Sequence, residues 1–262
     1  MFIIPMVGKS SRFFKEGYTE PKYKLLINGV SVFEHSVRSF ERYFLSDKFL
    51  FLVRSDYSAS DFVERKAKEM GILDFSIVEF SEETEGQADT VYKGLARAGN
   101  FVASDEPLYI FNIDTFRPDF EKSSKSVDDG YLEVFQGEGM HWSFALPGEN
   151  GKVLKTTEKD RISDLCSNGL YYFKSSTIFN KAFEHSVREG LKAKGEFYIA
   201  PLYNFLIENG LKVSYELVPA SKIFFCGTPA EYQSILQRQA VLNDSEGSAV
   251  RAGSLCASPG SN

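Results

Sequence analysis

Short apolar runs alternate with amphipathic helical stretches over the first half of the chain, and this alternation limits the folds open to it. Four runs have the length and composition of strands, over Phe2–Met6, Phe49–Val53, Phe75–Val78 and Leu108–Asn112. Between them we predict three helices, over Val32–Tyr43, Ala59–Met70 and Gln87–Ala98. Such alternation produces a mostly parallel sheet that is covered by helices on both faces. The sequence therefore predicts a three-layer α/β fold with a mixed, mostly parallel sheet.

From Gly130 onward the pattern changes to strands that follow one another more closely. We predict strands over Tyr131–Gln136, Ser143–Leu146, Val153–Thr157, Gly169–Lys174, Lys212–Leu217 and Lys222–Phe225. Helices are predicted over Ser176–Arg188, Ile199–Glu208 and from the Thr228 cap to about Leu242. We expect one domain over residues 1–242, with halves 1–125 and 126–242, and a disordered tail over residues 243–262.

Composition and charge exclude several classes of protein. The formal net charge of −6 argues against a general binder of nucleic acids or anionic membranes. Neither a signal peptide nor an apolar run long enough to span a membrane is found. The three cysteines, Cys166, Cys226 and Cys256, lack the spacing of a metal site or a disulfide scaffold, so we expect a reducing cytoplasm.

The first apolar run leads directly into a small, polar, cation-bearing segment. Phe2–Met6 is followed by Gly8-Lys9-Ser10-Ser11-Arg12-Phe13, and Pro21-Lys22 then brings another cation on a stiff backbone. A buried strand that ends in such a loop is typical of a phosphate-binding turn. The segment lacks the earlier glycine of the Gly-x-x-x-x-Gly-Lys-Ser/Thr loop. The alternative is a basic surface loop followed by an ordinary turn.

A carboxylate follows the fourth predicted strand, in Asn112-Ile113-Asp114. Ligands of open α/β sheets gather beyond the carboxyl ends of the strands. A hard carboxylate at that edge suits Mg²⁺, which binds carboxylate and phosphate oxygens and keeps several waters. Asp114 is therefore the candidate metal ligand, and the alternative is that it only caps the segment that follows.

These segments occur in the order found in another group of proteins. The chain resembles the nucleotidyltransferases that activate sugar phosphates and related phosphates, whose opening pattern is Gly-x-Gly-x-x-Arg-Leu/Phe followed by Pro-Lys-x-Leu. The later matches are Gly86-Gln87-Ala88 at a helix start, Asp114 after a strand, Glu158-Lys159, and the Asn-Gly pair at Gly169. Each motif is weak alone, but the series spans most of the chain.

The resemblance implies a Rossmann-like fold and specific roles. Arg12 and Lys22 would be catalytic, stabilising charge on the phosphates, and Asp114 would bind Mg²⁺. Acceptor binding would use Glu158, Lys159 and Gly169. Nucleotide binding would use Met6, Gly8, Lys9, Ser10, Ser11, Gly86, Gln87, Ala88 and Asn112. Gln87 has a competing interpretation, because Thr84-x-x-Gln87 also fits a helix capping box.

The reaction implied by the resemblance joins the NMP part of an NTP to a phosphorylated acceptor and releases pyrophosphate. The relatives include capsule-locus enzymes, among them a cytidylyltransferase that acts on phosphoglutamine. We therefore expect CTP or another pyrimidine NTP, an acceptor that is a sugar phosphate or another small phosphate, and a role in capsule or surface polysaccharide synthesis. The oligomeric state, including a homo-oligomer, stays open.

Three departures from the family pattern keep alternatives open. Phe225 stands where the family often has a second metal-binding Asp, Asp160 replaces a proline, and the opening loop reads Gly8-Lys9-Ser10 instead of Gly-Gly-x-Gly. A metal-dependent glycosyltransferase of similar fold would also use an Asn/Asp-x-Asp motif. A non-catalytic nucleotide-binding regulatory protein would explain the missing second carboxylate.

Overall fold

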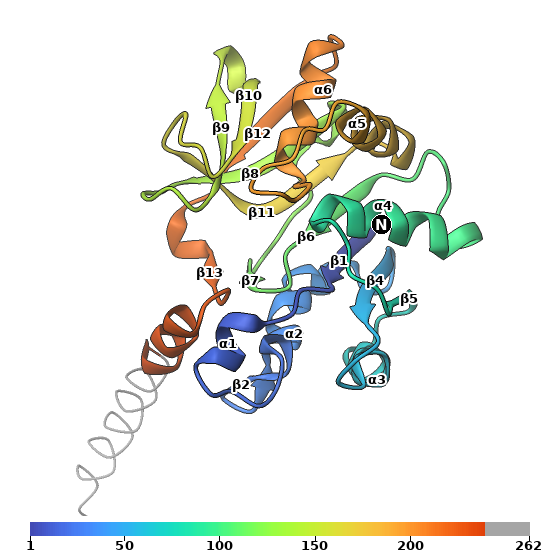
Figure 1. The fold of residues 1–262 in the computed structure, drawn as a ribbon, viewed down its shortest axis with the longest axis vertical. Helices are drawn as coiled ribbons and strands as arrows, with labels where there is room; N and C mark the ends of the chain where they lie inside the picture. Colours follow the sequence, from blue (N-terminus) through green and yellow to red (C-terminus); the bar gives the residue numbers. More distant parts are fainter. Residues whose placement is uncertain (239–262) are drawn as a thin grey trace, which may run out of the picture.

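A mixed sheet forms the centre of the molecule (Figure 1). The structure is a computed structural model that describes residues 1–238, and within them the sheet has nine strands. Its parallel part runs in the spatial order β5 (Asp74–Phe80), β4 (Lys48–Arg54), β1 (Phe2–Met6), β6 (Leu108–Phe111). The antiparallel part starts at β11 (Leu165–Phe173), which pairs with β6, β8 (Gly130–Gln136) and β9 (Ser143–Pro147). Strand β10 (Val153–Glu158) completes the edge beside β9, and β12 (Val213–Leu217) runs parallel to β8.

Helices cover both faces of this sheet because its strands alternate buried side chains between the two faces. In β1, Ile3 belongs to the buried apolar cluster that includes residues of α4 (Gln87–Ala98), α5 (Ser176–Arg188) and α6 (Tyr203–Glu208). Its neighbours Phe2 and Ile4 belong to a second cluster, which includes residues of α2 (Val32–Val37), the 3₁₀ helix η2 (Arg38–Tyr43) and α3 (Ala59–Met70). Burial of alternate apolar side chains on both faces holds three layers together. The predicted three-layer α/β fold is confirmed.

The largest differences from the predicted elements occur where a ring or a glycine interrupts the regular backbone. The helix predicted over Val32–Tyr43 divides into α2 and η2, and Phe40 has φ −110° and ψ 20°. The Phe40 ring is fully buried, 4.4 Å from the Phe2 ring centroid. Strand β11 begins at Leu165 instead of Gly169, because Gly169 lies within a bulge of a longer buried strand.

Several short elements have too few residues for a periodic pattern. They are α1 (Ser11–Lys15), β2 (Leu26–Ile27), β3 (Val30–Ser31), β7 (Thr115–Phe116) and β13 (Phe224–Phe225). The remaining 3₁₀ helices are η1 (Lys22–Lys24), η3 (Gly99–Phe101), η4 (Ser124–Val127), η5 (Glu149–Gly151), η6 (Ala200–Leu202) and η7 (Ala220–Lys222). Strand β13 is shorter than the predicted Lys222–Phe225 because Ala220–Lys222 is helical.

The last described helix begins at the predicted cap. Thr228 Oγ1 accepts a hydrogen bond from the Glu231 N–H at 3.2 Å, and Glu231 Oε2 accepts one from the Thr228 N–H at 2.9 Å. Residues 229–238 are helical, while the predicted end near Leu242 and the predicted tail over 243–262 lie outside the described residues. None of the helices in residues 1–238 has the length and apolar character that a membrane crossing requires.

Candidate active site

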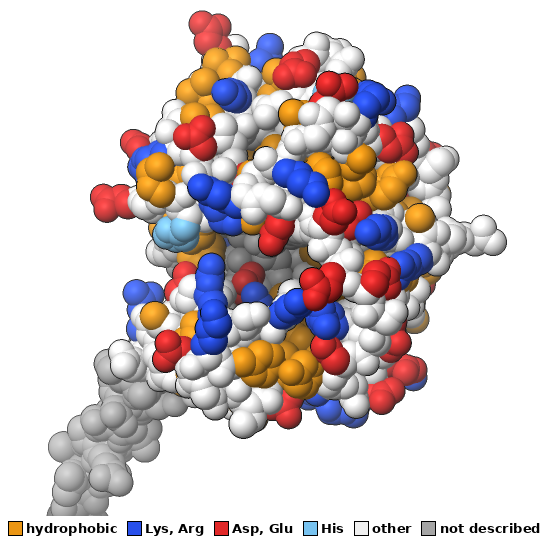
Figure 2. Space-filling model, viewed as in Figure 1, with side chains coloured by type: hydrophobic (Ala, Val, Ile, Leu, Met, Phe, Trp, Pro, Cys, Tyr) orange, Lys and Arg blue, Asp and Glu red, His pale blue; other side chains and the backbone are white. Residues whose placement is uncertain are grey.

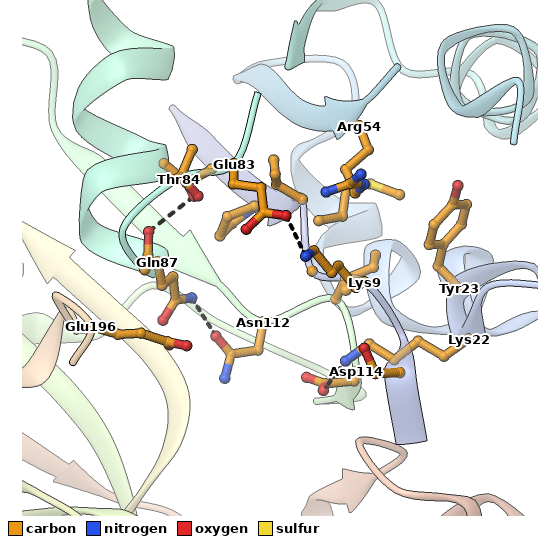
Figure 3. Close-up of a pocket in the computed structure, with 18 residues that line it drawn as sticks. Lys9, Lys22, Tyr23, Arg54, Glu83, Thr84, Gln87, Asn112, Asp114 and Glu196 are labelled. Carbon is orange, nitrogen blue, oxygen red and sulfur yellow. Dashed lines mark hydrogen bonds and ion pairs between the residues drawn. The ribbon is translucent and has the colours of Figure 1, made fainter. Parts of the chain in front are cut away.

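The carboxyl ends of β1, β4 and β6 open into one cavity of about 560 Å³. It belongs to the hollowed, charge-rimmed middle of the face shown in Figure 2, and Figure 3 gives a close view of its lining. Most of the predicted nucleotide-binding residues line it, together with the predicted catalytic Lys22 and the predicted metal ligand Asp114; the nucleotide-binding residues are Met6, Gly8, Lys9, Ser11, Gly86, Gln87 and Asn112. The rule that ligand sites lie beyond the carboxyl ends of parallel strands therefore locates this cavity.

The opening loop is held by its own backbone and by the segment that carries Lys22. Ser10 adopts left-handed backbone angles, with φ 52° and ψ 27°, immediately before α1. Its Oγ accepts a hydrogen bond from the Lys22 N–H at 3.1 Å, and Ser10 itself does not line the cavity. Lys9 reaches across the cavity to the Glu83 carboxylate (Figure 3). Ser10 thus ties the two cationic segments together.

Lys22 and Asp114 both line the cavity and contact each other. Lys22 Nζ lies 2.5 Å from Asp114 Oδ2, and the two side chains are only 20% and 22% exposed (Figure 3). Two segments that are far apart in the sequence therefore present one cation and one carboxylate at the same point. Both groups still reach solvent, so a phosphate could approach Lys22 and a cation could approach Asp114.

The helix start at Gly86 forms another wall of the cavity. Gly86 has φ +117°, and a Cβ there would lie 2.5 Å from the Phe197 carbonyl oxygen, so only glycine fits. Gln87 Nε2 donates to Asn112 Oδ1 at 2.6 Å. Gly86 is the N-cap of α4 and no side chain caps this helix, so the Thr84-x-x-Gln87 capping box is not formed. The amide of Gln87 instead faces the cavity (Figure 3).

Ala88 is fully buried and lies outside this cavity. Its N–H donates to the Phe197 carbonyl at 3.0 Å, which leaves no free donor for a ligand. The observed contact of Ala88 is therefore with the protein backbone.

A neighbouring cavity of about 220 Å³ shares Gln87, Asn112 and Asp114 with the first. Predicted acceptor residues Glu158 and Gly169 line it, and we name it the acceptor-side cavity after that prediction. The first cavity is named the nucleotide cavity after the predicted nucleotide-binding residues in its lining. Arg12 also lines the acceptor-side cavity, away from the nucleotide cavity in which its implied role would place it. The two cavities adjoin at these three shared side chains, among them Asp114, so molecules bound in the two cavities would meet there.

The acceptor-side cavity combines a buried carboxylate with an aromatic wall. Ser143 Oγ donates to Glu158, and burial raises the pKa of the Glu158 carboxyl above its usual range. On another side, Trp142 packs against Phe225, with ring centroids 4.7 Å apart. Phe225 thus contributes to an apolar surface at the position where the family often has an Asp.

Lys159 does not itself line the acceptor-side cavity, but it contacts a residue that does. Its Nζ donates to Tyr198 Oη at 2.5 Å, and Tyr198 lines the cavity. Burial lowers the pKa of Lys159, but its contacts with Tyr198 and Glu158 outweigh burial and raise the pKa above its usual value. Lys159 therefore stays charged beside the acceptor-side cavity.

The donor set fits a magnesium ion that arrives with phosphate groups. Within residues 1–238, no group of three or more His, Cys, Asp and Glu side chains is arranged to hold a metal. Mg²⁺ is usually bound through one or two carboxylates plus substrate phosphates and water, so Asp114 alone meets that requirement. Glu231 is nearby: a Cβ on Gly227 would lie 2.9 Å from Asp114 Oδ2 and 3.6 Å from Glu231 Oε2. Glu231 Oε2, however, already accepts from the Thr228 N–H.

A buried ionic network supports the strand behind Gly169. Glu133 is 2% exposed; its Oε2 accepts from Arg117 Nε at 3.0 Å and from Asn168 Nδ2 at 2.6 Å. Asn168 Oδ1 in turn accepts from the Leu170 N–H at 3.0 Å. These bonds fix the bulge that places Gly169 against Asn112.

We predict that Glu133→Gln lowers the free energy of unfolding by about 1.5–3 kcal/mol, because it removes a buried charge-assisted contact with Arg117. Urea unfolding measures this loss, with Glu149→Gln, an exposed carboxylate, as the matched control. Equal stability of the two variants would show that the network does not support the site.

Several lining residues were not among the sequence predictions. Arg54 ends β4 and lines the nucleotide cavity, and Glu196 reaches the same cavity from the second half of the chain. Trp142 and Tyr198 line the acceptor side. The strand-end rule that selected Asp114 would also have selected Arg54, whereas the other three depend on tertiary packing.

Comparisons with known proteins agree with this arrangement. The chain is similar to the nucleoside-diphosphate-sugar pyrophosphorylase from Vibrio cholerae RC9, with 48% sequence identity and a TM-score of 0.88, over 90% of this chain and 100% of that chain. The inositol-1-phosphate CTP transferase from T. maritima has 15% identity and a TM-score of 0.68, over 90% of this chain and 94% of that chain. A UDP-glucose pyrophosphorylase complexed with UDP-glucose has 15% identity and a TM-score of 0.67, over 91% and 97%.

The last two similarities show the fold alone. No protein-family model and no curated protein matches the chain. The identity to the Vibrio cholerae protein extends over nearly all of both chains. The protein therefore belongs to the nucleoside-diphosphate-sugar pyrophosphorylase family and is a nucleotidyltransferase.

Proposed function

We propose that the protein transfers the NMP part of an NTP to the phosphate of a small acceptor and releases pyrophosphate. The observation that carries this proposal is the position of the Lys22–Asp114 pair, at the place where the two cavities adjoin. An α-phosphate at this point would contact the nucleotide site on one side and the acceptor on the other. The halves 1–125 and 126–242 would then supply most of the nucleotide and acceptor contacts, respectively.

In this mechanism an oxygen of the acceptor phosphate forms a bond to the α-phosphorus. The bond from the α-phosphorus to the bridging oxygen breaks, and its electron pair leaves with pyrophosphate. No protein nucleophile is needed, because positioning and charge stabilisation supply most of the catalysis in reactions of this type. Lys22 would neutralise charge at the α-phosphate, Arg12 would hold the acceptor phosphate, and the Gly8–Ser11 backbone would bind the nucleotide phosphates.

Asp114 would hold Mg²⁺, and this ion would neutralise phosphate charge when bound. Asn112 keeps Gln87 oriented through their hydrogen bond, so that the Gln87 amide can contact the nucleobase. Glu158 would accept hydrogen bonds from hydroxyl groups of the acceptor, and the bulge at Gly169 would leave room for it. These roles extend the proposal to each residue of the site.

For the substrates, we propose CTP or another pyrimidine NTP and a small phosphorylated acceptor. The Lys9-Ser10 form of the opening loop supports the first, because it is similar to cytidylyltransferase loops. The acceptor would be a sugar phosphate or a small phosphate such as phosphoglutamine, since Glu158 and the aromatic wall at Trp142 suit either. The product would serve capsule or surface polysaccharide synthesis in the cytoplasm.

A screen of the common NTPs against phosphorylated acceptors tests the proposal through pyrophosphate release. We expect release only when both an NTP and a matching acceptor are present. Transfer from an NDP-sugar to an alcohol would instead indicate a glycosyltransferase. Nucleotide binding without turnover across the screen would indicate a regulatory protein.

We predict that Lys159→Ala raises the KM for the acceptor about ten- to a hundredfold, because a charge-assisted contact near the acceptor is lost. The KM for the NTP should change little, since Lys159 does not line the nucleotide cavity. Steady-state kinetics with each substrate varied in turn measures both constants. Lys155→Ala, an exposed change on β10, the strand that ends one residue before Lys159, is the control. A larger effect on the NTP than on the acceptor would contradict the two-site arrangement.

A further inference from the structure

A side cavity of about 280 Å³ opens from the nucleotide cavity at Arg54. The two cavities share Met6, Gly8, Lys9, Ser11, Tyr23 and Arg54. The side cavity shares no lining residue with the acceptor-side cavity. The nucleotide cavity therefore lies between them, with Asp114 at its acceptor end and Arg54 at its other end.

Arg54 is presented to this space in a fixed orientation. Its side chain is 24% exposed, and its Nε donates to Asp56 Oδ2 at 2.8 Å. Within residues 1–238, the side-chain hydrogen bonds of Arg54 involve Nε alone, which leaves the two terminal nitrogens available. In the view of Figure 3, Arg54 and Asp114 reach the cavity from opposite sides of Lys9. A guanidinium held through Nε presents a planar pair of donors, which suits phosphate oxygens.

The loop after Arg54 is tied to the segments that carry the phosphate-site candidates. Tyr57 and Ser58 both have positive φ, at 53° and 47°, so the backbone turns sharply after Asp56. The Tyr57 ring stacks on Phe14 of α1, with centroids 5.5 Å apart, and Lys24 of η1 donates to the Tyr57 carbonyl. These contacts build the wall of the side cavity against both α1 and η1.

The direction of the reaction identifies what this end of the cavity would bind. In an in-line displacement the leaving group departs on the side of the α-phosphorus opposite to the attacking oxygen. The proposed acceptor lies beyond Asp114, so the leaving pyrophosphate must point away from Asp114, toward Arg54. We propose that Arg54, held by Asp56, binds the β- and γ-phosphates of the NTP and the pyrophosphate that leaves, with Lys9 as the adjacent cation. This inference rests on the proposed function.

The reverse reaction gives a selective test, because pyrophosphate and the NDP-acceptor are then separate substrates. The NDP-acceptor lacks the leaving pyrophosphate. Arg54→Gln should therefore raise the KM for pyrophosphate about ten- to a hundredfold and leave the KM for the NDP-acceptor within about twofold. Measurements of direct binding should show the same selectivity. The ratio of the Kd for NMP to the Kd for the matching NTP should fall by a similar factor in Arg54→Gln. Arg54→Lys keeps the charge without the planar fork, and should lie between wild type and Arg54→Gln.

Arg42→Gln is the matched control, because Arg42 also pairs with a carboxylate, Glu121, but lines none of the three cavities. If wild type turns over and Arg54→Gln keeps its KM for pyrophosphate and its preference for NTP, the role of Arg54 is wrong and the proposed function stands. Equal increases in both KM values would indicate a structural effect and also contradict the proposal. A wild type that binds no nucleotide would overturn both. If Arg54→Gln does not fold, Arg54→Lys alone decides, since unchanged pyrophosphate kinetics would refute a bidentate contact.

Discussion

Asp114→Asn is expected to lower turnover about a thousandfold in a protein that still folds. The substitution keeps the size of the side chain but removes the charge that would hold Mg²⁺ and that pairs with Lys22. Asparagine keeps the shape of the side chain and an oxygen that can accept a hydrogen bond from Lys22, so the loss of stability should stay small enough for the protein to fold. The rate is measured as a function of magnesium concentration, and excess metal should restore part of the activity by raising the metal-bound fraction.

The control is Asp119→Asn, the same change at an exposed position five residues along the chain. Asp119 has φ 56°, a conformation that asparagine also adopts readily, so this variant should fold and react like wild type. Normal activity and normal magnesium dependence of Asp114→Asn would contradict the assignment of Asp114. A melting temperature far below that of Asp119→Asn would reveal a structural role instead.

Lys22→Ala is expected to reduce kcat/KM about a hundredfold, which corresponds to ~3 kcal/mol of transition-state stabilisation. The physical reason is the loss of a point charge at the α-phosphate while the backbone bond from Lys22 to Ser10 remains. Stopped-time assays of pyrophosphate release measure the rate. Lys15→Ala, an exposed lysine on α1, is the control, and Lys22→Arg should recover part of the rate.

The Lys22 and Asp114 substitutions should also be non-additive, because the two side chains contact each other. The double variant is expected to lose less activity than the product of the two single losses. Full additivity would indicate that the two groups act in separate places. A well-folded Lys22→Ala with wild-type kinetics would rule out its role at the phosphate.

The sequence predicts those elements whose apolar pattern is long and regular. Strand β1 and helices α3, α4 and α5 have the predicted bounds, because β1 is a continuous apolar run and each of the three helices repeats apolar residues at helical spacing. The non-helical backbone at Phe40 could not be predicted from the sequence, because it occurs where the Phe40 ring packs against Phe2 of β1 and Phe111 of β6. Gly169 suggests a strand start in the sequence but is a bulge inside β11, which only the pairing with β8 reveals.

The same contrast applies to the residues of the candidate site: sequence motifs predict some of them, and tertiary packing determines the others. Motif order alone predicts that Gly8, Lys22, Gln87 and Asp114 lie together, and they line one cavity. The sequence could not predict that Arg12 lines the acceptor-side cavity. Its side-chain direction is set by α1, and this helix of five residues is too short to show a periodic pattern. Trp142, Tyr198 and Glu196 come from loops or strand ends whose position depends on how the second half of the sheet packs.

The fate of labelled phosphorus tests the central claim most directly. The NTP that is active in the screen is supplied once with label in the α-phosphate and once with label in the γ-phosphate, together with its acceptor. Nucleotidyl transfer predicts that the α-label appears in the NDP-acceptor and the γ-label in pyrophosphate, in equal amounts. Transfer of the γ-label to the acceptor, or release of the α-label as free NMP at the same rate without acceptor, would contradict it.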